Sequence, residues 1–167
     1  MRAAGLAGVL TFALAGCGGG DDAGTGPGTA SGGGDSIAVT AEPVDTCALF
    51  TADDFASVVG KPAGQPEKQE PQGSLLGGCT YLSKDVTVSV YVTARPGREW
   101  DDSVKAHGDV SVSGVGEKAF WADNVGLLVQ PAGKPYFLQV LAMPDLSNPT
   151  AFGKELSVAV GQVAADR

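Results

Sequence analysis

Residues 86–93 read Val86-Thr87-Val88-Ser89-Val90-Tyr91-Val92-Thr93, and this alternation is the strongest fold signal in the chain. Successive side chains of a strand point to opposite faces, so alternating valine predicts a half-buried strand with its valine face on a core. The other face, which carries Tyr91, is expected to point outward or onto a cleft. Residues 78–83 fit a preceding strand, with Lys84-Asp85 as a tight hairpin turn between the two.

A helix is predicted to begin just before this strand pair. Thr51 can accept hydrogen bonds from free backbone N–H groups, and Asp54 lies three residues later, where it can reach back to Thr51. Gly60 and Pro62 are expected to end the helix. Residues 61–74 are polar and contain prolines, which predicts a loop up to the first strand.

The chain beyond the strand pair alternates further helices and strands. Trp100 and Val104 recur at helical spacing within residues 99–107, and Gly108 is the expected end of that helix. Val110 and Val112 predict a short edge or lead-in strand. Another strand is predicted to begin at residues 119–121. Two more strands are predicted at residues 125–130 and 136–143.

A turn and a terminal helix complete the predicted fold. Prolines flank residues 131–135, and because proline donates no ladder hydrogen bond, this segment is expected to be a turn. Asn148-Pro149 is a predicted helix cap. The apolar residues that then share one helix face are Phe152, Leu156, Val160 and Val163. The order of elements predicts an α+β fold: an antiparallel sheet with helices packed on one face, in a single domain at 45–167.

The first residues predict export. Arg2 is followed by an apolar run that is too short for a permanent membrane span but suits a signal peptide. The run ends in Leu14-Ala15-Gly16-Cys17, which resembles the lipobox of bacterial lipoproteins. We therefore expect residues 1–16 to be removed and Cys17 to carry acyl chains such as palmitate. Two or three chains give stable attachment to the outer face of the cell membrane, where one chain binds only marginally.

Residues 17–44 and the overall charge limit the possible partners. The segment after Cys17 is rich in Gly, Ser and Asp and has no apolar periodicity, so we expect a flexible linker. The net charge of −8 excludes electrostatic binding of nucleic acid, which needs clustered Lys and Arg. It also excludes attachment to anionic lipid by surface charge, so the membrane contact is expected to be the lipid on Cys17.

The remaining cysteines, Cys47 and Cys79, form an even pair in an oxidising compartment, which predicts a structural disulfide. The alternative is a redox pair. It is disfavoured because the chain has no Cys-x-x-Cys spacing and no basic residue adjacent to either cysteine to lower a thiol pKa.

Four short motifs carry a family resemblance. They are residues 14–17 (Leu-Ala-Gly-Cys), 45–51 (Asp-Thr-Cys-Ala-Leu-Phe-Thr), 78–81 (Gly-Cys-Thr-Tyr) and 113–121 (Ser-Gly-Val-Gly-Glu-Lys-Ala-Phe-Trp). On these motifs the chain resembles the actinobacterial lipoproteins grouped as domain of unknown function three-five-five-eight. Thr46 and Lys118 depart from that family's usual proline and acidic residue. The resemblance implies an exported, disulfide-bonded α+β lipoprotein with no assigned reaction.

No catalytic constellation stands out in the sequence. His107 is the only histidine, and at the end of a predicted helix it is expected to interact with the helix dipole. A zinc site needs several His or Cys ligands, so no metal or cofactor is expected. The pairs Asp53-Asp54 and Asp101-Asp102 fit helix starts better than calcium ligands or catalytic acids.

Three functions therefore remain open. The first is a non-catalytic binding module for a protein, cell-wall or lipid partner, with Tyr91 and Trp121 lining a possible groove between sheet and helix. The second is a carrier that holds a small hydrophobic or lipid ligand in an apolar pocket. The third is an extracytoplasmic hydrolase, which requires His107 or two carboxylates to converge in a cleft.

Overall fold

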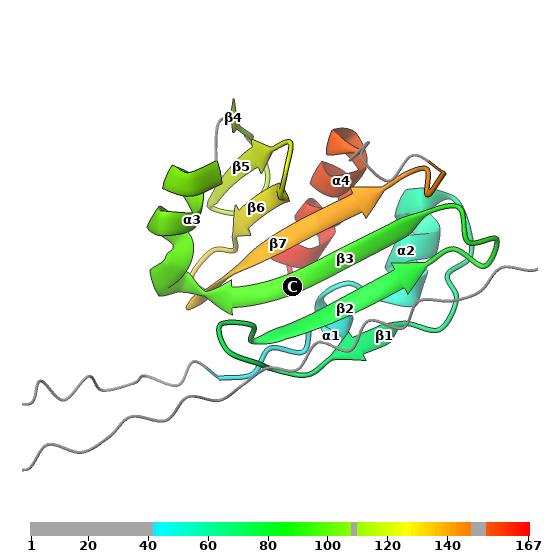
Figure 1. The fold of residues 1–167 in the computed structure, drawn as a ribbon, viewed down its shortest axis with the longest axis horizontal. Helices are drawn as coiled ribbons and strands as arrows, with labels where there is room; N and C mark the ends of the chain where they lie inside the picture. The colour runs from blue at the N-terminus through cyan, green and yellow to red at the C-terminus, as the bar shows by residue number, and fades with distance from the viewer. Residues whose placement is uncertain (1–41, 108–109, 148–152) are drawn as a thin grey trace, which may run out of the picture. The chain divides into compact units, whose positions relative to one another are not determined.

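Strands β3 (Ser89–Pro96) and β7 (Tyr136–Met143) form the centre of the sheet, side by side in Figure 1. The structure is a computed structural model that describes residues 42–107, 110–147 and 153–167. The two central strands pair antiparallel along their whole length, from Ser89 opposite Met143 to Pro96 opposite Tyr136. This pairing joins two halves of the domain that are distant in sequence.

The described residues place seven strands in one antiparallel sheet, in the order β1-β2-β3-β7-β6-β5-β4. Hairpins connect β2 (Gly77–Leu82) to β3 and β6 (Gly126–Gln130) to β7. Strand β5 (Lys118–Ala122) pairs with the other side of β6 in the sheet. The edges of the sheet are the short strands β1 (Glu67–Gln69) and β4 (Val110–Ser111). Both edge strands are exposed, and their brevity limits pairing with other chains.

Helices α1 (Thr46–Leu49), α2 (Ala52–Val59) and α4 (Lys154–Ala165) pack on one face of the sheet (Figure 1). Phe55 of α2 stacks on Tyr81 of β2, with ring centroids 5.9 Å apart. Gly161 lets α4 lie close to β6, because a Cβ there would come within 2.5 Å of Leu127 Cδ2. The antiparallel α+β fold with packed helices is thus confirmed.

Helix α3 (Trp100–His107) differs, because it packs on the opposite face of the sheet. It follows the 3-10 turn η1 (Gly97–Glu99), and Trp100 meets Phe137 of β7 edge to face at 5.6 Å. Phe137 alternates with Leu138, which belongs to the main core on the other side. The prediction that all helices share one face therefore holds for α1, α2 and α4 only.

The main core lies between the sheet and helices α1, α2 and α4. Its largest fully buried side chains include these: Phe50, Phe55, Tyr81, Leu127 and Leu138. A smaller cluster lies under α3 and contains Trp100, Leu128 and Phe137. The described residues belong to one compact unit, so these two layers belong to one domain.

Several local predictions are confirmed. Thr51 caps α2 in a capping box with Asp54, and Gly60 ends that helix in the left-handed conformation with φ of 74°. Strand β7 has the predicted bounds, and residues 131–135 lie between β6 and β7. The cap predicted at Asn148-Pro149, the helix face at Phe152 and the helix end at Gly108 lie outside the described residues.

The predicted strand over residues 86–93 is wrong at both ends, because β3 runs from Ser89 to Pro96. Ser83 N–H donates to the Val88 carbonyl, and the Ser83 hydroxyl accepts from the backbone N–H groups of Thr87 and Val88. These bonds close a loop longer than the two-residue turn predicted at Lys84-Asp85. Val86 lies in that loop with φ of 53° and 61% exposure, so its place in the valine alternation is coincidental.

Two short elements were not predicted. Residues 61–74, expected to be a loop, contain the exposed edge strand β1. Helix α1 precedes α2 and has one turn of residues, with no side-chain cap. Neither element has an apolar periodicity long enough to detect in the sequence.

Candidate functional site

The register of the sheet places Tyr91 and Trp121 on opposite faces. Residues paired across antiparallel strands share a face. Trp121 pairs with Leu127, Leu127 with Val140, and Val140 with Val92, so Trp121 lies on the face of Val92. Tyr91 neighbours Val92 on β3 and therefore faces the other way. The predicted groove lined by Tyr91 and Trp121 does not form, and Trp121 is instead a core residue with 5% exposure.

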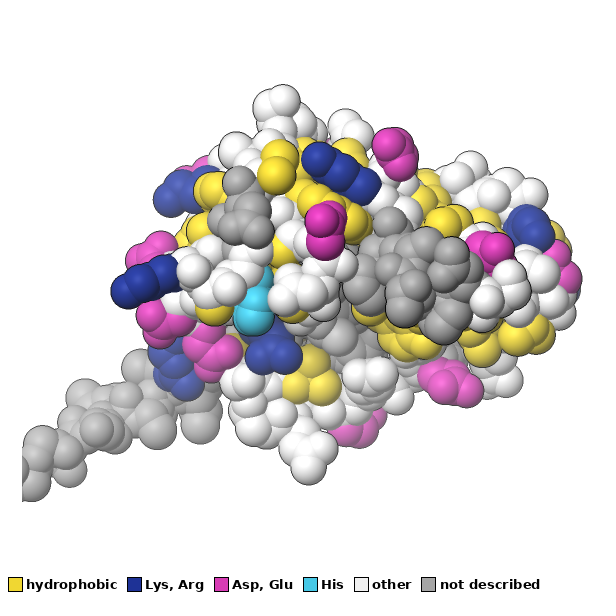
Figure 2. All heavy atoms as spheres, turned by 45° about the horizontal axis from the view of Figure 1, so that its top comes forward, with side chains coloured by type: hydrophobic (Ala, Val, Ile, Leu, Met, Phe, Trp, Pro, Cys, Tyr) yellow, Lys and Arg dark blue, Asp and Glu magenta, His cyan; other side chains and the backbone are white. Residues whose placement is uncertain are grey.

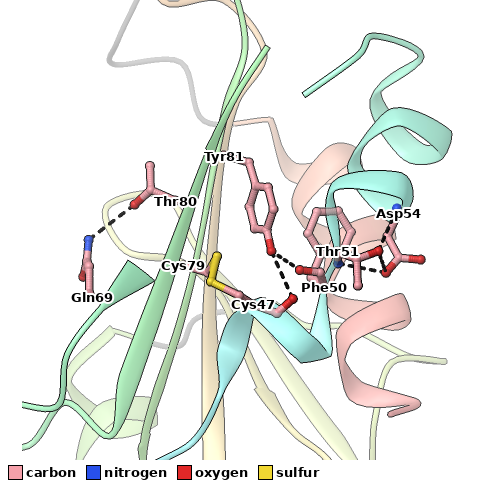
Figure 3. The surroundings of a disulfide bond; sticks show 8 residues. All are labelled: Cys47, Phe50, Thr51, Asp54, Gln69, Cys79, Thr80 and Tyr81. Carbon is pink, nitrogen blue, oxygen red and sulfur yellow. Dashed lines mark hydrogen bonds between the residues drawn. A yellow bond between two sulfur atoms is a disulfide. The ribbon is translucent and has the colours of Figure 1, made fainter. Parts of the chain in front are cut away.

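Cys47 and Cys79 form the predicted disulfide (Figure 3), which ties α1 to β2. Their Cα atoms lie 5.2 Å apart, and Cys79 is 1% exposed. The Tyr81 hydroxyl next to the bridge donates to the carbonyls of Cys47 and Phe50. Because Cys79 is buried next to these hydrogen bonds, the disulfide is better suited to a structural role than to thiol exchange.

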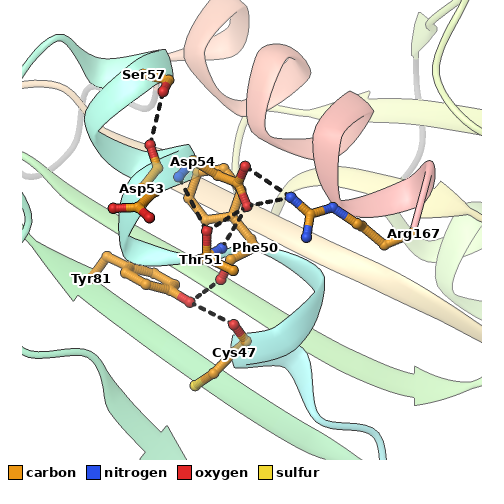
Figure 4. Close-up of polar contacts among 8 residues, drawn as sticks. All are labelled: Cys47, Phe50, Thr51, Asp53, Asp54, Ser57, Tyr81 and Arg167. Atoms are coloured by element: carbon orange, nitrogen blue, oxygen red, sulfur yellow. Dashed lines mark hydrogen bonds and ion pairs between the residues drawn. The ribbon is translucent and has the colours of Figure 1, made fainter.

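Asp54 of the acidic pair at the start of α2 has a structural role as well (Figure 4). The Asp54 carboxylate accepts from Thr51 N–H at 2.9 Å and from the Arg167 guanidinium at 2.9 Å. Burial acts to raise the pKa of Asp54, but the bonds from Thr51 and Arg167 outweigh it and leave the pKa lowered. The nearby Tyr81 phenol has its pKa raised to about 12 by burial and then by the charges of Asp54 and Asp45.

The other acidic candidates are not gathered into a site either, because Asp53, Asp101 and Asp102 are exposed. His107 is exposed as well. Within the part of the chain that the structure describes, no group of three or more His, Cys, Asp or Glu side chains could hold a metal ion. No described helix is long and apolar enough to span a membrane. Cys17 and the rest of the predicted signal peptide lie outside the described residues.

A pocket that sequence reasoning missed lies between α3 and the sheet. It has a volume of about 150 Å³. Its polar lining comes from both elements, with Arg95 and Gln139 on β3 and β7, and Ser103 and His107 on α3. Its apolar lining is Val125, Leu128 and Phe137.

The local structure explains why these side chains converge. Arg95 pairs with Phe137 across β3 and β7, and Gln139 is two residues further along β7, so all three share the α3 face. Trp100, Ser103, Val104 and His107 follow helical spacing, and Trp100 anchors that stripe on the sheet. No sequence motif signals this pocket, because it depends on which face α3 covers.

A second hollow of about 380 Å³ is lined by the continuous segment 111–120. Val115 points from this segment into the core and is 3% exposed. Gly116 has φ of 55°, and a Cβ there would come within 2.6 Å of the Gln130 carbonyl oxygen. Residues 112–117, between β4 and β5, therefore form a tightly anchored loop. Apart from Glu117 and Lys118, the described residues that line this hollow carry no charged side chain.

The surface around these features is of mixed sign. Figure 2 shows acidic and basic side chains interspersed with hydrophobic ones, with the histidine at the surface in cyan. A field of one sign that could steer a highly charged polymer is absent from this view. The chain matches no protein-family model, no curated protein and no solved structure.

Proposed function

We propose that this chain is a lipoprotein held on the outer face of the cell membrane, and that its folded domain is a non-catalytic binding module. In this proposal residues 1–16 are a signal peptide, Cys17 carries the lipid, and residues 17–44 are a linker. The lipobox sequence and the family resemblance of the motifs support this proposed location. The Cys47–Cys79 bond supports it too, because structural disulfides belong to oxidising compartments.

One observation carries the binding role: among the described residues, the pocket under α3 gathers donor groups but no carboxylate. Arg95, Ser103, His107 and Gln139 line it, and none of the described residues in its lining is Asp or Glu. A serine and a histidine without an acid to orient the imidazole lack the third member of a hydrolytic triad. The same set of donors, placed over apolar side chains, suits a small polar ligand.

The carrier alternative finds less support. The layer between the sheet and helices α1, α2 and α4 is filled by Phe50, Phe55 and Tyr81, each with 0% exposure. Phe50 and Tyr81 are in edge-to-face contact at 5.4 Å. A lipid chain has no room where these rings pack, because protein interiors are as dense as organic crystals.

Lipid attachment is tested by expressing the full chain in a bacterium with lipoprotein processing and labelling it with palmitate. The native chain should carry label and sediment with membranes, and Cys17→Ser should lose both. The matched control is the double variant Cys47→Ser/Cys79→Ser, which keeps Cys17 and should keep the label. Label retained by Cys17→Ser would overturn the proposed lipid attachment at Cys17.

The binding role is tested on the same membrane-purified protein by measuring hydrolase activity and ligand binding together. A non-catalytic module should show no turnover of ester or amide substrates that depends on His107. If His107→Gln abolished a measurable hydrolysis while leaving the fold intact, the hydrolase alternative would replace this proposal.

A further inference from the structure

We propose that the pocket between α3 and the sheet binds the carboxylate group of a small organic acid. This inference rests on the proposed binding role and adds the chemical class of the ligand. This pocket brings together four polar side chains of the described chain: Arg95, Ser103, His107 and Gln139.

Arg95 is the central group of the site. It is half-buried on β3, and its Nη1 donates to the Ser74 hydroxyl at 3.2 Å. That bond holds one arm of the guanidinium and leaves the other N–H groups for a ligand. Within the described residues Arg95 has no carboxylate partner, whereas Lys61 is paired with Asp85 and Arg167 with Asp54.

The absence of a carboxylate partner for Arg95 among the described residues matters because the chain is acidic, with a net charge of −8. A half-buried guanidinium is stabilised by an anion, and its planar fork matches the two oxygens of a carboxylate. The carboxylates of the described residues do not supply that anion, since none of them lines the pocket. An external carboxylate therefore completes a charge pair that the fold leaves open.

The remaining polar groups add donors around the same space. Ser103 and His107 are one helical turn apart on α3, and each can donate a hydrogen bond. Gln139 Nε2 donates to the Val125 carbonyl at 2.9 Å. That bond fixes the amide orientation, and the second amide hydrogen remains for a ligand.

The size and the apolar wall define the rest of the ligand. Cavities of about 150 Å³ accept molecules of the size of benzene. Leu128 and Phe137 form an apolar wall that favours a short hydrocarbon stem next to the carboxylate. Inorganic phosphate would gain nothing from that wall, and its second negative charge has no second fixed cation in the pocket.

The test uses the lipidated protein purified from membranes in detergent, labelled with ¹⁵N and titrated with propionate. Propionamide is the matched neutral probe, and inorganic phosphate is the alternative anion. Propionate should shift the Arg95 side-chain N–H signal and the backbone signals of Ser103 and Gln139, with a Kd on the order of 1 mM for so few atoms. Propionamide and phosphate should bind at least about 10-fold more weakly.

Variants separate a charge effect from a specific site. Arg95→Gln should abolish the propionate shifts, and Arg95→Lys, which keeps the charge but loses the fork, should weaken binding about 10-fold. Lys105→Gln removes the same charge from an exposed position on α3 and should change affinity less than about twofold. Near-ultraviolet circular dichroism checks that each variant is folded.

Equal binding of propionamide, tighter binding of phosphate, or an unchanged affinity in Arg95→Gln and Arg95→Lys would each overturn the carboxylate assignment. No saturable shift with propionate would overturn it as well. None of these results alters palmitate labelling at Cys17 or the search for hydrolysis, so failure here is distinct from failure of the proposed function.

Discussion

The two faces of the same sheet are used in different ways. On β3, Val90, Val92 and Ala94 are completely buried under helices, while Tyr91, Thr93 and Arg95 alternate with them and keep partial exposure. The first face supplies the main core, and the second carries the polar groups of the pocket. Stability and ligand contacts are therefore separated within one strand, so a side chain on one face can be changed with little effect on the other.

The polar side chains on the two faces also differ in how many of their hydrogen-bonding groups have partners. The Tyr81 hydroxyl on the covered face is satisfied by the carbonyls of Phe50 and Cys47. On the other face, Arg95 has one neutral partner, the hydroxyl of Ser74, among the described residues. Buried polar groups are normally fully hydrogen-bonded, whereas groups at a binding site keep capacity for a ligand.

The largest expected effect compares Trp121 with Tyr91. Trp121→Ala should lower the free energy of unfolding by about 3–5 kcal/mol, because it leaves a cavity in the main core. Tyr91→Ala on the opposite face should cost less than about 1 kcal/mol. Urea unfolding followed by circular dichroism measures both. Similar losses for the two variants would contradict the separation of the faces.

Trp121 and Tyr91 also show where sequence reasoning stops. Alternation shows that neighbouring residues of a strand face opposite ways, but it does not tell which residues of different strands share a face. That depends on the long-range pairing of β3 with β7 and on the registers of the hairpins that join β7 to β6 and β6 to β5. The groove prediction failed for this reason, and the pocket at Arg95 and His107 was missed because it depends on the face that α3 covers.

Local chemistry was predictable where neighbouring residues decide it. The Thr51–Asp54 capping box follows from a three-residue spacing, and Gly60 ends α2 with a positive φ. The Cys47–Cys79 bond follows from the count of cysteines that remain once Cys17 is set aside as the predicted lipid site. These features depend on a few residues or on redox environment, so they need no knowledge of the sheet order.

The second prediction tests the covered face through its disulfide. The double variant Cys47→Ser/Cys79→Ser should lose roughly 3–4 kcal/mol of unfolding free energy, because the bridge closes a loop with a sequence separation of 32. Differential scanning calorimetry measures the lower Tm. Reductant should lower the Tm of the native chain but leave that of the double variant unchanged. Carboxylate binding at Arg95 should persist below the new Tm, since the bridge lies on the other face.

A smaller effect is expected at the start of α2, where Asp54→Ala should cost about 1–2 kcal/mol. The substitution removes the bond from Thr51 N–H and the pair with the partly exposed Arg167. Chemical denaturation at neutral pH measures the loss. Asp53→Ala is the matched control and should cost less, because the Asp53 side chain is exposed and has no part in the capping box.

The pH dependence of this loss has a definite sign. The pKa of Asp54 is lowered in the folded state, because bonds from Thr51 and Arg167 outweigh the raising effect of burial. Its contribution is therefore complete above the pKa of an unfolded Asp, about 3.9, and disappears as the pH falls through the lowered folded value. The difference between the native chain and Asp54→Ala should shrink below pH of about 4. A difference that grew on acidification would contradict this sign.

The smallest effect has the opposite direction and lies in the loop between β2 and β3. Val86 has φ of 53° and is 61% exposed, so its branched side chain bears the steric cost of the left-handed region without packing in return. Val86→Asn should raise the free energy of unfolding by about 1 kcal/mol, because asparagine tolerates this conformation. Val88→Asn is the contrasting variant: Val88 is 6% exposed in the main core, so the same change two residues later should destabilise the protein. Opposite signs for two valines of one alternating run would show that the loop, and not the pattern, decides their environment.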